Sequence, residues 1–110
     1  MSGHDTLQRL AAVIASRRHG DGNKSYTRQL LDAGPERCAK KFGEEAVETV
    51  LAGVHADPAQ LQAEAADTLY HLLVLLESRG VPLSDVMAVL ERRMGTSGLE
   101  EKASRPGSQS

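Results

Sequence analysis

The sequence predicts an all-α fold, a bundle of four to five helices, on three observations. The chain of 110 residues is 40% hydrophobic, which suffices for one small domain with a single core. Its three aromatic residues are Tyr26, Phe42 and Tyr70, so the core must be aliphatic, and this favours helix over sheet. Apolar residues also recur three and four positions apart, which is the spacing of an amphipathic helix.

Start and stop signals divide the first third of the chain. A first helix is expected from Thr6 to Arg18, with Asp5 or Thr6 as its N-cap. Two glycines, an Asp and an Asn within 19–24 predict an exposed loop. A short helix is expected over Ser25–Ala33, and Gly34 should end it.

Two long helices should follow. Pro35 fits the first turn of one, which is expected to reach residue 52 or 54. Asp57 can cap the second, which is expected over 58–79. This second helix is apolar on most sides, through Leu69, Leu72, Leu73, Val74, Leu75 and Leu76. A helical chain this small can hardly surround such a helix alone, so we expect a homodimer with a shared bundle core.

Ser84 can cap a last helix that extends to residue 93 or 94. Residues 1–95 are therefore expected to form one all-α domain. The tail over 96–110 is rich in Ser, Gly and charge and lacks periodicity, so we expect it to be flexible. Within this tail, 97–105 should become ordered by substrate or by a partner chain.

Charge is segregated along the chain, although the formal net charge is only −2. The segment 42–78 contains seven acidic residues and no Lys or Arg, whereas the rest carries all thirteen basic residues against eight acidic ones. An acidic centre suits a hard cation, and basic flanks suit phosphate oxygens. A nucleic-acid partner would require an overall basic balance, so none is expected.

Cysteine content and hydropathy indicate the compartment. The single cysteine, Cys38, excludes an internal disulfide and a multi-cysteine metal site, and is expected to be a small core residue. No apolar N-terminal run suggests a signal peptide, and the longest strongly apolar run, 72–76, is far too short to span a membrane. We therefore expect a soluble cytoplasmic protein with no membrane partner.

Two acidic motifs stand in the two long helices. Glu44, Glu45 and Glu48 form E-E-x-x-E in the first, and Glu64 with Asp67 form E-x-x-D in the second. Spacings of three and four place each set on one helix face. If the two helices form an antiparallel hairpin, Glu45 lies opposite Asp67, and Glu48 lies opposite Glu64.

Four carboxylates at one level repel each other, and the hairpin offers no base to neutralise them except Lys41 at its edge. A bound cation resolves this conflict, and all-oxygen ligation selects Mg²⁺ or Mn²⁺ over zinc. A solvated helix face is the usual explanation for one such motif alone. Because two motifs match in register, we predict a metal site formed by Glu45, Glu48, Glu64 and Asp67.

Further segments accompany the acidic motifs. They are Ser25-Tyr26-Thr27 near the N-terminus and Ser97-Gly98-Leu99-Glu100-Glu101-Lys102 near the C-terminus. With these segments the chain resembles, from about residue 7 to 105, the phosphoribosyl-ATP pyrophosphatase family of histidine biosynthesis. That family belongs to the all-α NTP pyrophosphatase (MazG-like) superfamily, which is all that the acidic motifs alone would specify.

The resemblance implies Mg²⁺-dependent hydrolysis of phosphoribosyl-ATP to phosphoribosyl-AMP and pyrophosphate, the second step of the pathway. Glu44, Glu45 and Glu48 are the expected catalytic residues, with Glu44 either activating water or completing the metal shell. The expected substrate contacts are Lys41, Arg93, Lys102, Ser97 and Tyr26. Many relatives carry a cyclohydrolase domain upstream, and because this chain begins at the first helix, only the pyrophosphatase activity is expected.

Some candidate contacts have a structural alternative. Lys41 can touch phosphate or pair with the acids one turn further on, and Arg93 can interact with the end of its own helix. His71 follows Asp67 by four residues and can be a metal or substrate ligand, although a hydrogen bond to a carboxylate is its more common role. Rival functions for the chain are a MazG-like housekeeping (d)NTP pyrophosphatase and a non-enzymatic helical interaction module.

Overall fold

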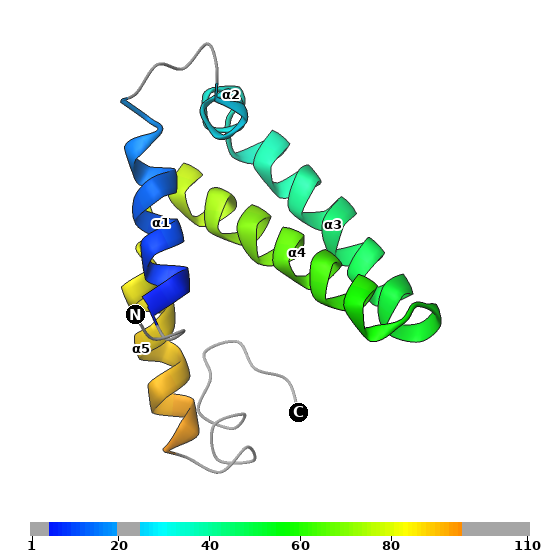
Figure 1. Cartoon of the computed structure of the whole chain (residues 1–110). Helices are drawn as coiled ribbons and strands as arrows, with labels where there is room; N and C mark the ends of the chain where they lie inside the picture. The colour runs from blue at the N-terminus through cyan, green and yellow to red at the C-terminus, as the bar shows by residue number, and fades with distance from the viewer. Residues whose placement is uncertain (1–4, 20–24, 96–110) are drawn as a thin grey trace.

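The computed structural model describes residues 5–19 and 25–95, and this part of the chain contains five helices (Figure 1). They are α1 (Thr6–Ser16), α2 (Tyr26–Ala33), α3 (Pro35–His55), α4 (Pro58–Ser78) and α5 (Leu83–Met94). No strand occurs among these residues, so the predicted all-α fold is confirmed. In the same residues no helix has both the length and the hydrophobicity that crossing a membrane requires.

The two long helices, α3 and α4, form an antiparallel hairpin whose turn projects away from α1 (Figure 1). At the other end of the hairpin, α2 packs against both long helices and α1 packs against α4. The guanidinium of Arg18, just beyond α1, donates to the carboxylate and to the backbone carbonyl of Glu77 near the end of α4. One end of the hairpin is therefore anchored, and its turn end carries no packed helix in Figure 1.

Most helix ends follow their sequence signals. The Ser25 hydroxyl accepts the Arg28 N–H at 3.1 Å to cap α2, and the Asp57 carboxylate accepts the Gln60 N–H at 2.9 Å to cap α4. Gly34, with φ of 100°, separates α2 from α3 in a conformation that other residues rarely adopt. The long helices thus begin at the residues that the sequence indicates.

The prediction that Ser84 caps the last helix is wrong. The N-cap residue of α5 is Pro82, which makes no side-chain cap bond, and Ser84 lies inside the helix. Proline fixes φ near −65°, and Pro82 with φ of −68° and ψ of 144° provides the extended residue from which the helix can start directly. The first helix also ends at Ser16, earlier than expected.

The core lies where the first four helices meet, and its buried residues are Ile14, Leu30, Leu31, Cys38, Leu73 and Val74. Cys38 is 1% exposed, and its thiol donates a hydrogen bond to the Leu30 carbonyl at 3.2 Å. The expected core role of this cysteine is confirmed. Each fully buried aliphatic side chain contributes about 1.5–3 kcal/mol, so this cluster holds the anchored end of the hairpin.

Candidate functional site

A pair of threonines fixes the register of the hairpin. The Thr49 hydroxyl on α3 lies 2.9 Å from the Glu64 carbonyl, and the Thr68 hydroxyl on α4 lies 2.9 Å from the Glu45 carbonyl. The two hydroxyl oxygens are 2.6 Å apart. These reciprocal contacts place Glu45 opposite Thr68, one residue from its predicted partner Asp67. The two acidic motifs therefore lie side by side across the hairpin.

The carboxylates of this face influence one another. The pKa of the Glu48 carboxyl is raised above its ordinary value, chiefly because Glu45 hydrogen-bonds to it and repels its charge. Burial and the charge of Asp67, across the hairpin, raise this pKa further, while Lys41 opposes the shift. A cation placed among these groups would relieve the repulsion.

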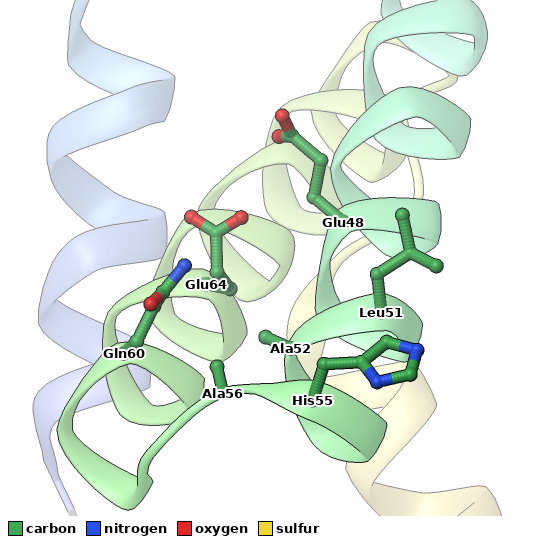
Figure 2. Close-up of a pocket in the computed structure, with 7 residues that line it drawn as sticks. All are labelled: Glu48, Leu51, Ala52, His55, Ala56, Gln60 and Glu64. Carbon is green, nitrogen blue, oxygen red and sulfur yellow. The ribbon is translucent and has the colours of Figure 1, made fainter.

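The acidic residues fit a hydrated hard cation better than a closed cage. Across residues 5–19 and 25–95, no three His, Cys, Asp or Glu side chains converge into a preformed metal cage. Glu48 and Glu64 nevertheless line the same pocket from opposite helices (Figure 2). Mg²⁺ commonly keeps several waters and is bound through one or two carboxylates together with substrate phosphates. An all-oxygen pair of this kind fits such an ion and does not suit zinc.

Lys41 and His71 lie at the anchored end of the acidic face. The Lys41 ammonium pairs with the Glu44 carboxylate at 3.3 Å, and this hydrogen bond is the main reason that the pKa of Lys41 is raised. On α4, His71 is 6% exposed, and its pKa is lowered by burial and by the charge of Lys41. The pairing of Lys41 with an acid, one of its two expected roles, is therefore present.

Two tyrosines enclose His71. The ring of Tyr26, itself 50% exposed, stands edge-on to the imidazole at 6.2 Å between centroids, and Tyr70 does so at 4.9 Å. Tyr70 also shares a hydrogen bond with the Thr27 hydroxyl. The buried Nδ1 atom of His71 has no hydrogen-bond partner among the described residues, so it does not make the expected bond to a carboxylate. Tyr26 lies beside the acidic face, as a substrate contact would require.

A pocket of about 460 Å³ occupies the turn end of the acidic face (Figure 2). It is lined by Glu48, Leu51, Ala52, His55, Ala56, Gln60 and Glu64. Sequence reasoning missed His55 and Gln60. Helical spacing is the signal that identifies them, because His55 follows Glu48 by seven residues and Gln60 precedes Glu64 by four.

The remaining predicted contacts are placed differently. Arg93 lies in the last turn of α5, which Figure 1 shows extending away from the turn of the hairpin. A basic residue there also suits the helix dipole, the alternative role considered for it. Ser97 and Lys102, with the rest of the tail, lie outside the described residues.

Comparison with known proteins identifies the family. The sequence model of the family described as phosphoribosyl-ATP pyrophosphohydrolase matches residues 7–94 of this chain. A phosphoribosyl-ATP pyrophosphatase from Paracoccus denitrificans is 60% identical over 107 residues, which cover 96% of this chain and 99% of the relative. A relative of the same name from Cereibacter sphaeroides is 58% identical over 99 residues, 90% of this chain and 96% of the relative. Phosphoribosyl-ATP pyrophosphatase 1 from Rhodopseudomonas palustris is 59% identical over 100 residues, 91% and 94% of the two chains. The chain therefore belongs to the phosphoribosyl-ATP pyrophosphohydrolase family.

Proposed function

We propose that this chain hydrolyses phosphoribosyl-ATP to phosphoribosyl-AMP and pyrophosphate, in histidine biosynthesis and in the cytoplasm. The observation that carries the proposal is the acidic face of the hairpin, in a chain that belongs to this family. The pKa of Glu48 is raised by its hydrogen bond with Glu45 and by the negative charge of that residue, and a cation carried in with a polyphosphate substrate offsets the repulsion.

The proposed metal ligands are Glu45, Glu48, Glu64 and Asp67, holding Mg²⁺ or Mn²⁺. When bound, such an ion neutralises phosphate oxygens, which otherwise repel a nucleophile. Glu44 orients the attacking water and accepts its proton, while Lys41 keeps the Glu44 carboxylate in place. The water oxygen bonds to one phosphorus of the α,β bridge as its proton passes to Glu44, the bond from that phosphorus to the bridging oxygen breaks, and phosphoribosyl-AMP and pyrophosphate separate. Glu44, Glu45 and Glu48 form the proposed catalytic set.

A pyrophosphate-release assay tests this function. Purified protein is given phosphoribosyl-ATP or a panel of dNTPs, with Mg²⁺ and with EDTA. Turnover of phosphoribosyl-ATP that requires Mg²⁺ is expected. Strong turnover of dNTPs alone would favour a housekeeping pyrophosphatase, and no turnover together with no Mg²⁺ affinity would favour an interaction module.

Variants connect the activity to the acidic face. Glu48→Gln and Asp67→Asn each remove a charge at nearly constant shape, so both should nearly abolish turnover while the helical circular dichroism is retained. Glu36→Gln is a matched control, because Glu36 is an exposed acid in the first turn of α3. Equal activity of all three variants would contradict the proposed site.

The proposal includes a homodimer formed through α3. The residues Val47, Val50 and Val54 recur at helical spacing and are 58%, 64% and 71% exposed. Dimerisation is predicted from the apolar α4, in which Leu73 and Val74 are buried within one chain while Leu69 remains 43% exposed. A longer exposed apolar stripe lies on α3, and a second copy of the chain would cover it.

Sedimentation tests the dimer. The wild-type protein should sediment as a dimer at micromolar concentration, and Val50→Glu should give a monomer because a charge cannot be buried unpaired in the interface. Arg37→Glu, at an exposed position on another face of α3, is the control and should remain dimeric. A wild-type monomer of native helicity would contradict this part of the proposal.

Tail contacts complete the proposal. Arg93, Ser97 and Lys102 are proposed to contact the substrate, because two cationic side chains and a hydroxyl donor near the polyphosphate would supplement the bound cation. A chain truncated after Met94 should keep its helical circular dichroism and lose kcat/KM for phosphoribosyl-ATP. Full kcat/KM after truncation would show that the contacts at Ser97 and Lys102 are not used.

A further inference from the structure

The side chains along the face shared by α3 and α4 change in character from one end to the other. At the anchored end stand Lys41 on α3, whose ammonium pairs with the Glu44 carboxylate at 3.3 Å, and the buried His71 on α4. The carboxylates occupy the middle. At the turn end, His55 and Gln60 line the pocket of Figure 2.

The anchored end is the cationic end. No Lys or Arg occurs over 42–78, so Lys41 is the Lys or Arg nearest in sequence to the first acidic motif, and it pairs with Glu44 of that motif. Its ammonium lies 3.3 Å from the Glu44 carboxylate and, as for an ordinary lysine, is charged at neutral pH. A phosphate group that extends past the carboxylates toward α2 therefore meets a fixed positive charge.

The pocket at the turn end has the opposite character. Its lining contains no Lys or Arg, and the carboxylates of Glu48 and Glu64 at its inner edge would repel a bare phosphate. Leu51 and Ala52 offer apolar surface, and the Gln60 amide offers both a donor and an acceptor. A volume of about 460 Å³ with mixed apolar and polar lining is typical of a small-molecule subsite.

We propose that this pocket holds the nucleoside part of the substrate, with the Gln60 amide and the His55 ring contacting the base or ribose, and that the pyrophosphate leaving group lies toward Lys41. The inference rests on the proposed function, because it assigns a direction to a nucleotide in the same site. The scissile bridge then falls between the two ends, beside the carboxylates of the hairpin. Lys41 thus orients the triphosphate chain, and the pocket takes the base or ribose, while the phosphate of the phosphoribosyl group points out of the pocket, away from Glu48 and Glu64.

Calorimetric titration with two separate probes tests the direction. The full chain is titrated with AMP and, in a second series, with inorganic pyrophosphate, both in the presence of Mg²⁺. Gln60→Ala and His55→Ala should each weaken AMP binding by roughly 3- to 10-fold, the loss expected for one hydrogen bond, and leave pyrophosphate binding within about 2-fold. Lys41→Met should weaken pyrophosphate binding by about 10-fold or more and spare AMP.

Gln62→Ala is the matched control, because Gln62 is an exposed glutamine on α4 that does not line the pocket. It should change neither affinity. Exchanged effects, with Gln60→Ala weakening pyrophosphate and Lys41→Met weakening AMP, would overturn the proposed direction. Unchanged AMP binding in both pocket variants, or no AMP binding by the wild-type chain, would overturn the assignment of the pocket.

Because both titrations measure binding without turnover, this test is separate from the test of the proposed function. A chain that fails to hydrolyse phosphoribosyl-ATP but shows the two expected affinity patterns would refute the function and retain the nucleotide direction. Circular dichroism of each variant establishes that the helices are intact. If Gln60→Ala loses helicity, it is replaced by Gln60→Glu. This substitution keeps the length of the side chain and should weaken AMP binding because it removes the amide donor.

Discussion

Thr49 and Thr68 face each other across the hairpin with their hydroxyl oxygens 2.6 Å apart, while each also lies 2.9 Å from a carbonyl of the opposite helix. Two hydroxyl protons therefore serve three contacts, so the bonds to the carbonyls and the bond between the hydroxyls depend on one another. The carbonyls belong to Glu45 and Glu64, two of the proposed metal ligands. The threonine pair thus sets the level at which the two acidic motifs meet.

Thr49→Val removes one hydroxyl at nearly constant shape, and we expect it to lower the free energy of unfolding by about 1 kcal/mol. The Thr49→Val, Thr68→Val double variant should lose less than the sum of the single variants, because each substitution already removes the bond between the hydroxyls. Urea denaturation of the wild type, the two single variants and the double variant gives the four free energies of unfolding that a double-mutant cycle requires. Strict additivity would show that the two hydroxyls do not interact in solution.

The same substitution should reduce activity while the acidic residues remain present. If the threonine pair sets the register, Thr49→Val should lower kcat/KM for phosphoribosyl-ATP, and Thr49→Ser, which keeps the hydroxyl, should recover most of it. The comparison is made under conditions where both variants are fully folded. Equal kcat/KM values for the valine and serine variants would show that the register set by the threonine pair does not affect catalysis.

The hydrogen bond of Glu48 with Glu45, together with the charge of Glu45, predicts how stability without metal depends on pH. The pKa of Glu48 is raised in the folded protein, so its contribution to stability is fully present below the ordinary value of 4.5 and is lost as the pH rises through the folded value. Glu48→Gln cannot ionise and avoids this loss. In EDTA, the stability of the variant relative to wild type should therefore increase between pH 4 and pH 7.5.

Urea titrations at the two pH values measure this difference, with Glu36→Gln as the control outside the acidic face. Added Mg²⁺ should reverse the order, because the cation binds the folded wild type more tightly than the variant. A Glu48→Gln protein that is less stable than wild type in EDTA at pH 7.5 would assign the carboxylate a structural role.

The fold followed from local signals wherever a single residue type dictates local geometry. Asp57 caps α4 through the Gln60 N–H, and Gly34 takes the positive φ that separates two helices. Ser84 misled because a good capping residue stood two positions after Pro82, whose fixed φ starts the helix by itself. When two residues that favour a helix start lie this close together, their spacing alone does not show which one is the N-cap.

From the sequence, the candidate site could be predicted only for residues that recur at helical spacing. Spacings of three and four identified the two acidic motifs and their approximate pairing across the hairpin. The Thr49 and Thr68 contact was not predictable, because two isolated hydroxyls carry no periodic signal. The exposed stripe on α3 was missed for a different reason: the sequence shows that α4 is more apolar, but not that the first two helices cover Leu73 and Val74.

Cys38 should report the opening of the core. It is 1% exposed and lies in the cluster that anchors the hairpin, so a thiol reagent can reach it only when that cluster opens. Labelling by DTNB in native buffer should be slower than in urea by about a thousandfold or more, in line with the usual stability of small domains. Because the chain has a single cysteine, one rate describes one site. Rapid labelling under native conditions would mean that α2 separates readily from the hairpin.

His71 should make the protein sensitive to mild acid. Burial first, and then the charge of Lys41, lower its pKa below 6.5, while Asp67 and Glu44 only partly oppose the shift. A base with a lowered folded pKa contributes stability that is present above its unfolded value and is lost as the pH falls toward the folded value.

His71→Asn removes this titration and keeps an amide near the position of Nδ1. The difference in unfolding free energy between wild type and the variant should therefore shrink as the pH falls from about 7.5 to below 6.5. Urea denaturation in EDTA measures it, and the other histidines and Glu48 cancel because both proteins contain them. If the difference is constant over this range, the imidazole is not held neutral by the surrounding tyrosines and Lys41, and the ring must be solvated in the native protein.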